Sequence, residues 1–218
     1  MSTPQTFDLR QTVCVNPATG EVVGYSQMNT VEEARDALRR ARAAQPAWAA
    51  LPLEERVRYI ARIRDYLVEH ADEVSDTVAK DVGKTRIEAL ATEVLTSALA
   101  TDYYLKNAKR FLKPRKVRGG SLLFLNKRSR IYRIPFGVIG IIAPWNYPLG
   151  IPMHEIVPAL LAGNTVIFKT APETQMVGRK IEEMIQAADL PADVFTHLNI
   201  PGAIIGQILL EPDHHVDK

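Results

Sequence analysis

The sequence is poor in cysteine, nearly balanced in charge and without a long uninterrupted apolar run. Its single cysteine, Cys14, excludes an internal disulfide framework. A formal net charge of +2 gives no strong attraction to nucleic acid or to an anionic membrane. The most apolar stretch, residues 139–161, is interrupted by Trp145-Asn146-Tyr147-Pro148 and by His154-Glu155, so no membrane span is predicted. The N-terminus has no apolar core of a secretory signal, and together these features predict a cytoplasmic protein.

What the sequence does contain is typical of a globular protein. It has 218 residues, 46% hydrophobic and 24% charged, enough for one or two domains with a substantial core. The β-prone runs 12–15 and 22–25, joined by a turn-rich segment, predict an N-terminal hairpin. Thr30, with Glu33 three residues later, predicts a capping box at the start of a helix. The apolar stripe of that helix is Val31, Ala34, Leu38 and Ala41.

Two further helices are predicted before residue 106. One starts near Leu53 and has Val57, Ile60, Ile63 and Leu67 at helical spacing. The other begins after Gly83, where Thr85 and Glu88 form a second capping box. Its inward face is predicted to consist of Ile87, Leu90, Ala91, Val94 and Leu95.

A basic stretch and an arm precede the second half of the chain. Residues 106–118 carry enough positive charge to suggest a nucleic-acid surface, but no reader motif accompanies them, which favours a solvated helix end. Gly119-Gly120 interrupts this stretch, and Leu122–Leu125 and Arg128–Arg133 are predicted to be extended. Because the latter alternates basic and other residues, we expect residues 119–134 to form an arm outside the core.

After Pro135 the sequence predicts an α/β fold with a doubly wound parallel sheet. Residues 138–143 and 165–169 are continuous apolar runs, as in strands covered on both faces. Helices are predicted at 149–161, kinked at Pro158, and at 174–188 and 203–210, with a third strand at 194–200. Val216–Lys218 is predicted to lead into a further strand. This β-α-β-α-β-α order is typical of a Rossmann-type sheet.

Ligands in such sheets bind beyond the carboxyl ends of the strands. The segments found there are 144–148, 169–173 and 199–202, with Gly206 inside the helix that follows. None matches the G-x-G-x-x-G fingerprint of dinucleotide-binding proteins. The residues alone therefore indicate a nucleotide-like ligand without its usual motif.

Two long motifs resemble the aldehyde dehydrogenase superfamily. They are Gly137–Leu149 (GVIGIIAPWNYPL) and Pro158–Lys169 (PALLAGNTVIFK), and both are gap-free. Asn16–Glu21 and Asp81–Lys84 (DVGK) resemble the N-terminal patterns of the family as well, so the similarity covers nearly the whole chain.

The resemblance implies three regions and a dinucleotide cofactor. Residues 1–118 would form a hairpin and helices packed on the cofactor domain, and residues 119–134 an oligomerisation arm. Residues 135–218 would form an incomplete, modified Rossmann domain that binds NAD or NADP. A complete version would be a homo-oligomer, a dimer or a tetramer.

The resemblance also implies the oxidation of an aldehyde to a carboxylic acid. In the family a cysteine thiolate attacks the carbonyl, an asparagine amide holds the resulting oxyanion, hydride passes to the nicotinamide, and a glutamate activates water. Asn146 corresponds to that asparagine. The alternative is that Asn146 only forms an Asx-turn before Tyr147-Pro148.

The cofactor contacts implied by the resemblance lie at the strand ends. Lys169 resembles the lysine that contacts the adenosine ribose, with a solvated charge at a strand end as the alternative. The family often has a glutamate three residues later, but here Pro172 takes that position and Glu173 follows, which leaves both NAD and NADP as candidates. The expected contacts are Ile142, Ala143, Pro144, Trp145, Lys169, Ala171, Glu173, Gly202 and Gly206.

The catalytic cysteine and glutamate of the family lie in segments beyond the residues given. Cys14, in the predicted hairpin, is expected to be a packed thiol rather than a substitute nucleophile. The chain is therefore expected to be an incomplete portion of an aldehyde dehydrogenase, inactive alone. The alternative is a non-catalytic remnant that binds at most nucleotide or partner subunits. Asp213-His214-His215 is expected to form a polar loop and not a metal site.

Overall fold

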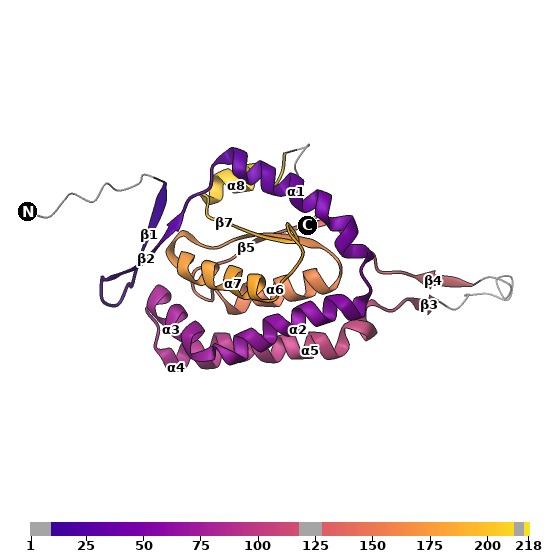
Figure 1. Cartoon of the computed structure of the whole chain (residues 1–218), viewed down its shortest axis with the longest axis horizontal. Coiled ribbons are helices and arrows are strands. Elements are labelled where there is room, and N and C mark those ends of the chain that lie inside the picture. The colour runs from indigo at the N-terminus through magenta and orange to yellow at the C-terminus, as the bar shows by residue number, and fades with distance from the viewer. Residues whose placement is uncertain (1–9, 118–127, 212–215) are drawn as a thin grey trace, which may run out of the picture.

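The computed structural model describes residues 10–117, 128–211 and 216–218. In these ranges a parallel sheet is covered by helices on both faces. The antiparallel ribbon β3–β4 extends from one end of the body, and the antiparallel hairpin β1–β2 lies at the opposite end (Figure 1). The elements are β1 Gln11–Val15, β2 Val22–Gln27, α1 Val31–Ala50, α2 Leu53–Glu69, α3 Ala71–Val82, α4 Arg86–Ala89, a π-helical turn Leu90–Val94, α5 Leu95–Leu112, β3 Arg115–Val117, β4 Ser129–Ile131, β5 Val138–Ile142, α6 Gly150–Leu161, β6 Thr165–Lys169, a 3-10 turn Pro172–Thr174, α7 Gln175–Ala187, β7 Phe195–Leu198 and α8 Gly202–Ile208.

The sheet has the order β5-β6-β7, and both strand pairs are parallel. Val216–Lys218 lies along the other edge of β5, where the amide of Asp217 donates to Val138 O at 2.8 Å and the amide of Gly140 donates to Lys218 O at 2.8 Å. The chain thus runs outward from β5 to β7 and then returns to the opposite side of β5. This reversal is the topological switch point beside which doubly wound sheets bind ligands.

Two apolar clusters lie on the two faces of the sheet. Val166 and Phe168 of β6 point into a cluster shared with α2, α3, α5, α6 and α7. Ile167 points to the other face, into a cluster shared with α1 and α8. All five residues of β6 are buried, as expected for a strand covered on both faces. The prediction of a doubly wound α/β fold is confirmed.

The N-terminal helices agree with the sequence only in part. The Thr30 hydroxyl accepts from the amide of Glu33, whose carboxylate accepts from the amide of Thr30, so the first capping box is confirmed. At the second predicted capping box the Thr85 hydroxyl accepts from the amide of Glu88 at 3.3 Å, which is one of the two bonds of such a box. α3 was not predicted, and α6 runs unbroken through Pro158.

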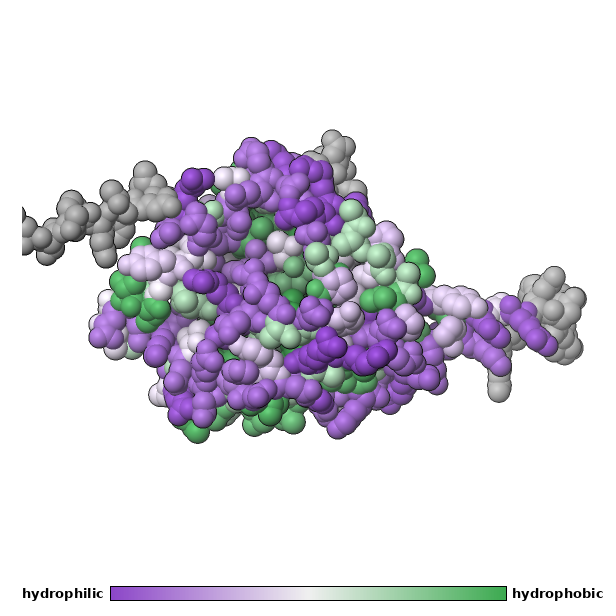
Figure 2. Space-filling view, in the orientation of Figure 1, coloured by the Kyte–Doolittle hydropathy of each residue, from purple (hydrophilic) through white to green (hydrophobic). Residues whose placement is uncertain are grey.

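The predicted inward face of the third helix is wrong at three of its five positions. Ile87 and Leu95 are 72% and 51% exposed, and Ala91 is exposed as well. The π-helical turn Leu90–Val94 contains one more residue per turn than an α-helix, which rotates the following residues around the axis. The inward positions are instead mostly small or polar, and hydrophobic side chains gather along the lower edge of the molecule, over α4 and α5 (Figure 2). The buried residues of this region are Ala89, Glu93, Val94, Ser97 and Thr101.

The arm is a two-stranded ribbon of β3 and β4, in which Arg115 pairs with Ile131 and Val117 with Ser129. Its first strand therefore lies within the segment assigned to the helical region. The expected extended run Leu122–Leu125 lies outside the described residues. At the basic end of α5, Lys106 pairs with Asp102, which agrees with a solvated helix end.

We predict that Phe168→Ala lowers the free energy of unfolding by about 3 to 5 kcal/mol, because the fully buried ring leaves a cavity in the central strand. Chemical denaturation of the chain measures this change. Phe136→Ala is the matched control, since that ring is 66% exposed and its removal should change the free energy by less than about 0.5 kcal/mol. Equal effects of the two substitutions would contradict the assigned core.

Candidate active site

The candidate site is the edge of the sheet where the three parallel strands end. Ile142 pairs with Lys169, and Lys169 pairs with Leu198, so the carboxyl ends of β5, β6 and β7 are level. The loops that follow the strands leave from this one edge. The structure therefore brings the three predicted segments to the same side of the sheet.

The loop after β5 presents Asn146 to solvent. Ala143 is buried and its amide donates to Lys169 O at 2.9 Å, which joins the start of this loop to the neighbouring strand. Ile142 and Trp145 are 52% and 60% exposed, and Pro144 is half-buried. The Asn146 side chain makes no hydrogen bond with the residues that the structure describes, so it is not held in an Asx-turn.

A buried ion pair from the N-terminal helices contacts the same loop. Lys84 Nζ lies 2.6 Å from Glu93 Oε1 and donates to Asn146 O at 3.0 Å. The same ammonium lies 4.5 Å from the centre of the Tyr147 ring. Glu93 Oε2 accepts from the amides of Leu149 at 2.9 Å and of Gly150 at 3.1 Å.

The loop after β6 contains the predicted ribose contact. Lys169 is buried, and this burial lowers the pKa of its ammonium group, an effect that the nearby Glu173 carboxylate opposes. Among the described residues, no side chain or carbonyl accepts a hydrogen bond from the Lys169 ammonium. Ala171 is buried, whereas Pro172 and Glu173 are exposed.

Asp81 supports the helix that follows this loop. Its Oδ2 accepts from the amide of Val177 at 2.9 Å, in the first turn of α7. Its Oδ1 is buried without a hydrogen-bond partner in the described structure. Burial raises the pKa of Asp81 from 3.8 to about 6, although the amides of Val177 and Met176 act in the opposite direction.

The third loop leads into α8, which starts at Gly202. A Cβ atom added at Gly202 or at Gly206 would meet no other atom within 4 Å. Neither glycine is required by the packing of the described chain. Open space therefore lies over both Cα atoms.

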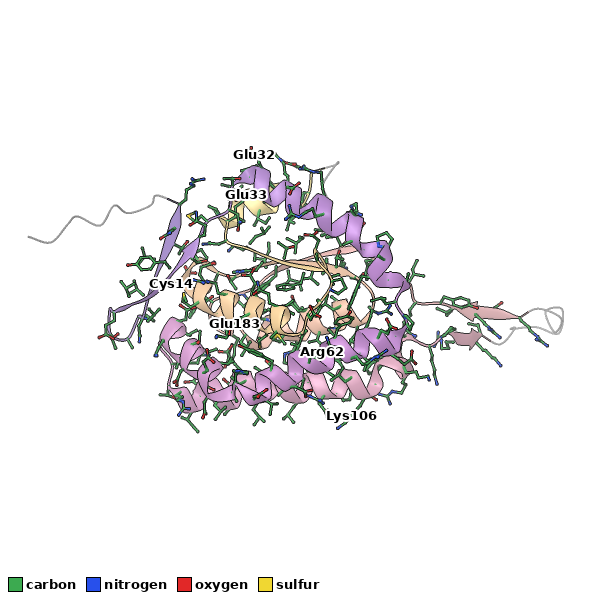
Figure 3. The ribbon with its side chains drawn as sticks, in the orientation of Figure 1. Cys14, Glu32, Glu33, Arg62, Lys106 and Glu183 are labelled. Atoms are coloured by element: carbon green, nitrogen blue, oxygen red, sulfur yellow. The ribbon has the colours of Figure 1, made fainter. Side chains whose placement is uncertain are left out.

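Cys14 does not belong to this site. It lies on β1, in the N-terminal hairpin (Figure 3), and it is 2% exposed because this hairpin packs on α7. Burial, together with the Asp81 carboxylate, raises the pKa of its thiol to about 11. Such a thiol is almost entirely protonated at neutral pH and is a poor nucleophile.

The described ranges show neither a metal site nor a membrane span. No group of three or more His, Cys, Asp or Glu side chains is placed to hold a metal ion, and Asp213-His214-His215 lies outside those ranges. In the same part of the chain, no helix is both long and apolar enough to cross a membrane.

Comparison with known proteins identifies the family. The family model described as the aldehyde dehydrogenase family matches residues 5–218. The chain belongs to this family. It is 34% identical over 201 residues to the α-ketoglutaric semialdehyde dehydrogenase of Bacillus subtilis, covering 91% of this chain and 40% of the relative.

Solved aldehyde dehydrogenases have the same fold. The NAD-dependent benzaldehyde dehydrogenase of Corynebacterium glutamicum is 29% identical, with a TM-score of 0.81 over 90% of this chain and 42% of the other. The succinic semialdehyde dehydrogenase of Streptococcus pyogenes, in complex with NADP+, is 26% identical, with a TM-score of 0.85 over 92% and 43%. The chain spans 37% and 40% of the length of two curated relatives that it matches.

The residues that support the loops are not predicted from the sequence. Lys84 and Asp81 belong to the DVGK motif, which in the sequence indicates the family and no contact, and no pattern singles out Glu93. The spacing of the motif was a usable signal, because it brings two charged residues to the end of one helix. The loop groups that they contact lie more than 50 residues away in the chain and give no local signal.

We predict that Asp81 makes the free energy of unfolding depend on pH. Because the pKa of Asp81 is higher in the folded chain than in the unfolded one, folding favours the protonated carboxyl. The stabilisation of the folded state is complete at pH values below the unfolded pKa, and it is lost as the pH rises through about 6. Asn does not titrate, so only the wild type loses this stabilisation. The unfolding free energy of Asp81→Asn minus that of the wild type should therefore increase by about 2 to 3 kcal/mol from pH 4 to pH 7.5. Urea unfolding at both pH values tests this, and a difference that does not change with pH would contradict it.

Proposed function

We propose that the chain forms the cofactor-binding part of an NAD- or NADP-dependent aldehyde dehydrogenase that oxidises an aldehyde to a carboxylic acid. The observation that carries this proposal is the level ends of β5 and β6, which bring the loops of Asn146 and Lys169 to one edge of the sheet in a member of this family. Relatives named as semialdehyde and benzaldehyde dehydrogenases support an aldehyde as the substrate.

Asn146 has the properties that an oxyanion donor needs. Its amide is neutral, so it donates a hydrogen bond without competing as a base for protons. Its side chain is exposed and has no hydrogen-bond partner among the described residues, so no internal bond must break before it binds a substrate oxygen. We assign to Asn146 the stabilisation of the negative charge that develops on the aldehyde oxygen.

The edge of the sheet also suits a dinucleotide. The Lys169 ammonium, which has no acceptor among the described residues, is available to a ribose hydroxyl, and the open space over Gly202 and Gly206 admits a ligand close to the backbone. We assign Ile142, Ala143, Pro144 and Trp145 to the nicotinamide end, and Ala171 and Glu173 to the ribose. When bound, the nicotinamide accepts the hydride that leaves the aldehyde carbon.

The expected ribose contacts of this chain do not distinguish NAD from NADP. A carboxylate on the ribose hydroxyls discriminates against a 2′-phosphate, and Pro172 supplies none at the position where the family often has glutamate. Solved relatives include one named as NAD-dependent and one in complex with NADP+. Both cofactors therefore remain in the proposal.

These 218 residues do not supply the nucleophile of the proposed reaction. Their only cysteine is buried, with a pKa raised to about 11, and lies on the hairpin. In the proposed enzyme the thiolate comes from another polypeptide segment. The alternative proposal is a non-catalytic remnant that binds at most nucleotide or partner subunits. The coding sequence distinguishes the two proposals, because for a remnant the reading frame downstream of Lys218 would encode no further cysteine-bearing segment.

We also propose that the complete protein is a homo-oligomer. The β3–β4 ribbon extends away from the body (Figure 1), where it adds nothing to the core. It carries exposed apolar side chains, as do the residues that follow it. Extended ribbons of this kind are stabilised when another chain covers them. These apolar residues are Val117, Ile131, Tyr132, Ile134 and Phe136.

We predict that Lys169→Met weakens the binding of NAD or NADP to the chain about tenfold, because one charge-assisted hydrogen bond to the ribose is lost. Isothermal titration calorimetry with both dinucleotides measures the dissociation constants. Lys109→Met is the matched control, because the side chain of Lys109 is 86% exposed and lies on α5. If Lys169→Met binds as tightly as the control, Lys169 does not contact the cofactor.

We predict that the purified 218-residue chain shows no aldehyde-dependent reduction of NAD or NADP. The physical reason is the absence of an activated thiolate, since Cys14 is buried and protonated. The absorbance of the reduced nicotinamide measures turnover, with succinic semialdehyde and benzaldehyde as substrates. Turnover that persists in Cys14→Ser would show that another group of this chain is the nucleophile and would overturn the assignment.

A further inference from the structure

Glu93 reaches the Asn146 loop from another helix. It lies in the π-helical turn Leu90–Val94 and is fully buried. α6 begins at Gly150 with Leu149 as its N-cap, and no side chain of its own caps it. The Glu93 carboxylate takes that role by accepting from both amides, which satisfies two of the unpaired N–H groups at the start of the helix.

Lys84 holds the middle of the same loop. Its ammonium donates to the carbonyl of Asn146 and lies over the ring of Tyr147, while its third interaction is the ion pair with Glu93. The side chain of Lys84 is 8% exposed and that of Glu93 is fully buried, so both groups have lost most of their water. Desolvation offsets much of the attraction in such a pair, so stability alone is a weak reason for its presence.

The two contacts fix the backbone that follows the Asn146 Cα, at its own carbonyl and at the amides of Leu149 and Gly150, while the bond from the Ala143 amide to Lys169 O holds the backbone before it. That side chain has no hydrogen bond of its own within the described structure, so its direction depends on the backbone that carries it. An oxyanion donor must lie about 2.7 to 3.1 Å from the reacting oxygen, and small displacements reduce its effect strongly. The loop that bears Asn146 therefore needs an anchor, and the ion pair is in contact with it.

We infer that Lys84 and Glu93 are positioning residues for Asn146, holding its loop in the geometry that oxyanion binding requires. This inference rests on the proposed function of Asn146. Lys84 and Glu93 themselves do not touch the substrate. They act through the carbonyl of Asn146 and through the amides of Leu149 and Gly150.

Hydrogen exchange of the 218-residue chain tests the anchor without any catalysis. In Lys84→Met and Glu93→Gln, the protection of the amides of Leu149 and Gly150 is expected to fall at least about tenfold, while that of β6 amides changes less. Lys84→Arg keeps the charge and the donors and should restore part of the protection. Unchanged protection in both variants would overturn the inference. If Lys84→Met does not fold, the protection measured in Glu93→Gln alone tests the inference.

Lys180→Met provides a matched control. Lys180 is also paired with two carboxylates, those of Glu73 and Glu183, each at 2.6 Å, and its side chain is 11% exposed. It lies on α7, away from the contacts of the Asn146 loop. This variant should leave the protection of Leu149 and Gly150 unchanged. A loss equal to that in Lys84→Met would mean that the effect is one of general stability.

A double-mutant cycle in the full-length enzyme tests the action through Asn146. Lys84→Met is expected to lower kcat about 10- to 100-fold with little change in cofactor affinity, and to have almost no further effect when Asn146→Ala is already present. Additive losses would overturn the positioning role. If Asn146→Ala alone leaves kcat unchanged, the proposed function of Asn146 fails, whereas the exchange result on the loop stands independently.

Discussion

The burial of β6 on both faces is the constraint on which the rest of the structure depends. A parallel strand with five buried residues needs helices above and below it, and the alternation of Val166 and Phe168 with Ile167 divides the core into two clusters. Parallel pairing also requires a helical crossover between neighbouring strands. These crossovers return the chain to the same starting edge each time, so the strands end level and their loops gather at one edge.

Buried polar groups from the N-terminal helices then stabilise those loops. Asp81 bonds to the first turn of α7, and the Lys84–Glu93 pair bonds to the loop between β5 and α6. Arg56, which is also buried, donates to the carbonyls of Leu161, Ala49 and Leu51, so it satisfies backbone groups where α1 and α6 end. In each case a charge is buried where backbone groups would otherwise lack partners, which explains why helices distant in sequence belong to the candidate site.

The sequence predicted the elements that depend on local patterns. The hairpin, the capping box at Thr30 and the apolar strands β5 and β6 follow from turn residues, capping residues and continuous hydrophobic runs. The face of the π-helical turn and of α5 could not be predicted in this way, because the turn changes the rotation per residue and places Glu93 inward while Leu95 faces outward. Periodicity assumes a constant rotation, and one extra residue in a turn is enough to invalidate it.

The candidate site was predictable only in part, for a related reason. The topology alone indicates the edge of the sheet, whereas the roles of Asn146 and Lys169 came from the resemblance to the family. Contacts such as that of Lys84 with the carbonyl of Asn146 join residues 62 positions apart, and no window of sequence contains both. A local sequence pattern therefore does not show which loop a buried charged side chain contacts.

The division of the proposed active site between this chain and a separate nucleophile has a physical consequence. Stabilisation of an oxyanion is most effective when the donor is already in place, because no reorganisation is then required as charge develops. Every contact that holds the Asn146 loop, from Lys84, Glu93 and the pairing of β5 with β6, is made within the described part of this chain. In the proposed reaction the donor side of the site is therefore already in place within this chain, and the thiolate, the cofactor and the group that activates water must be brought to the same edge of the sheet.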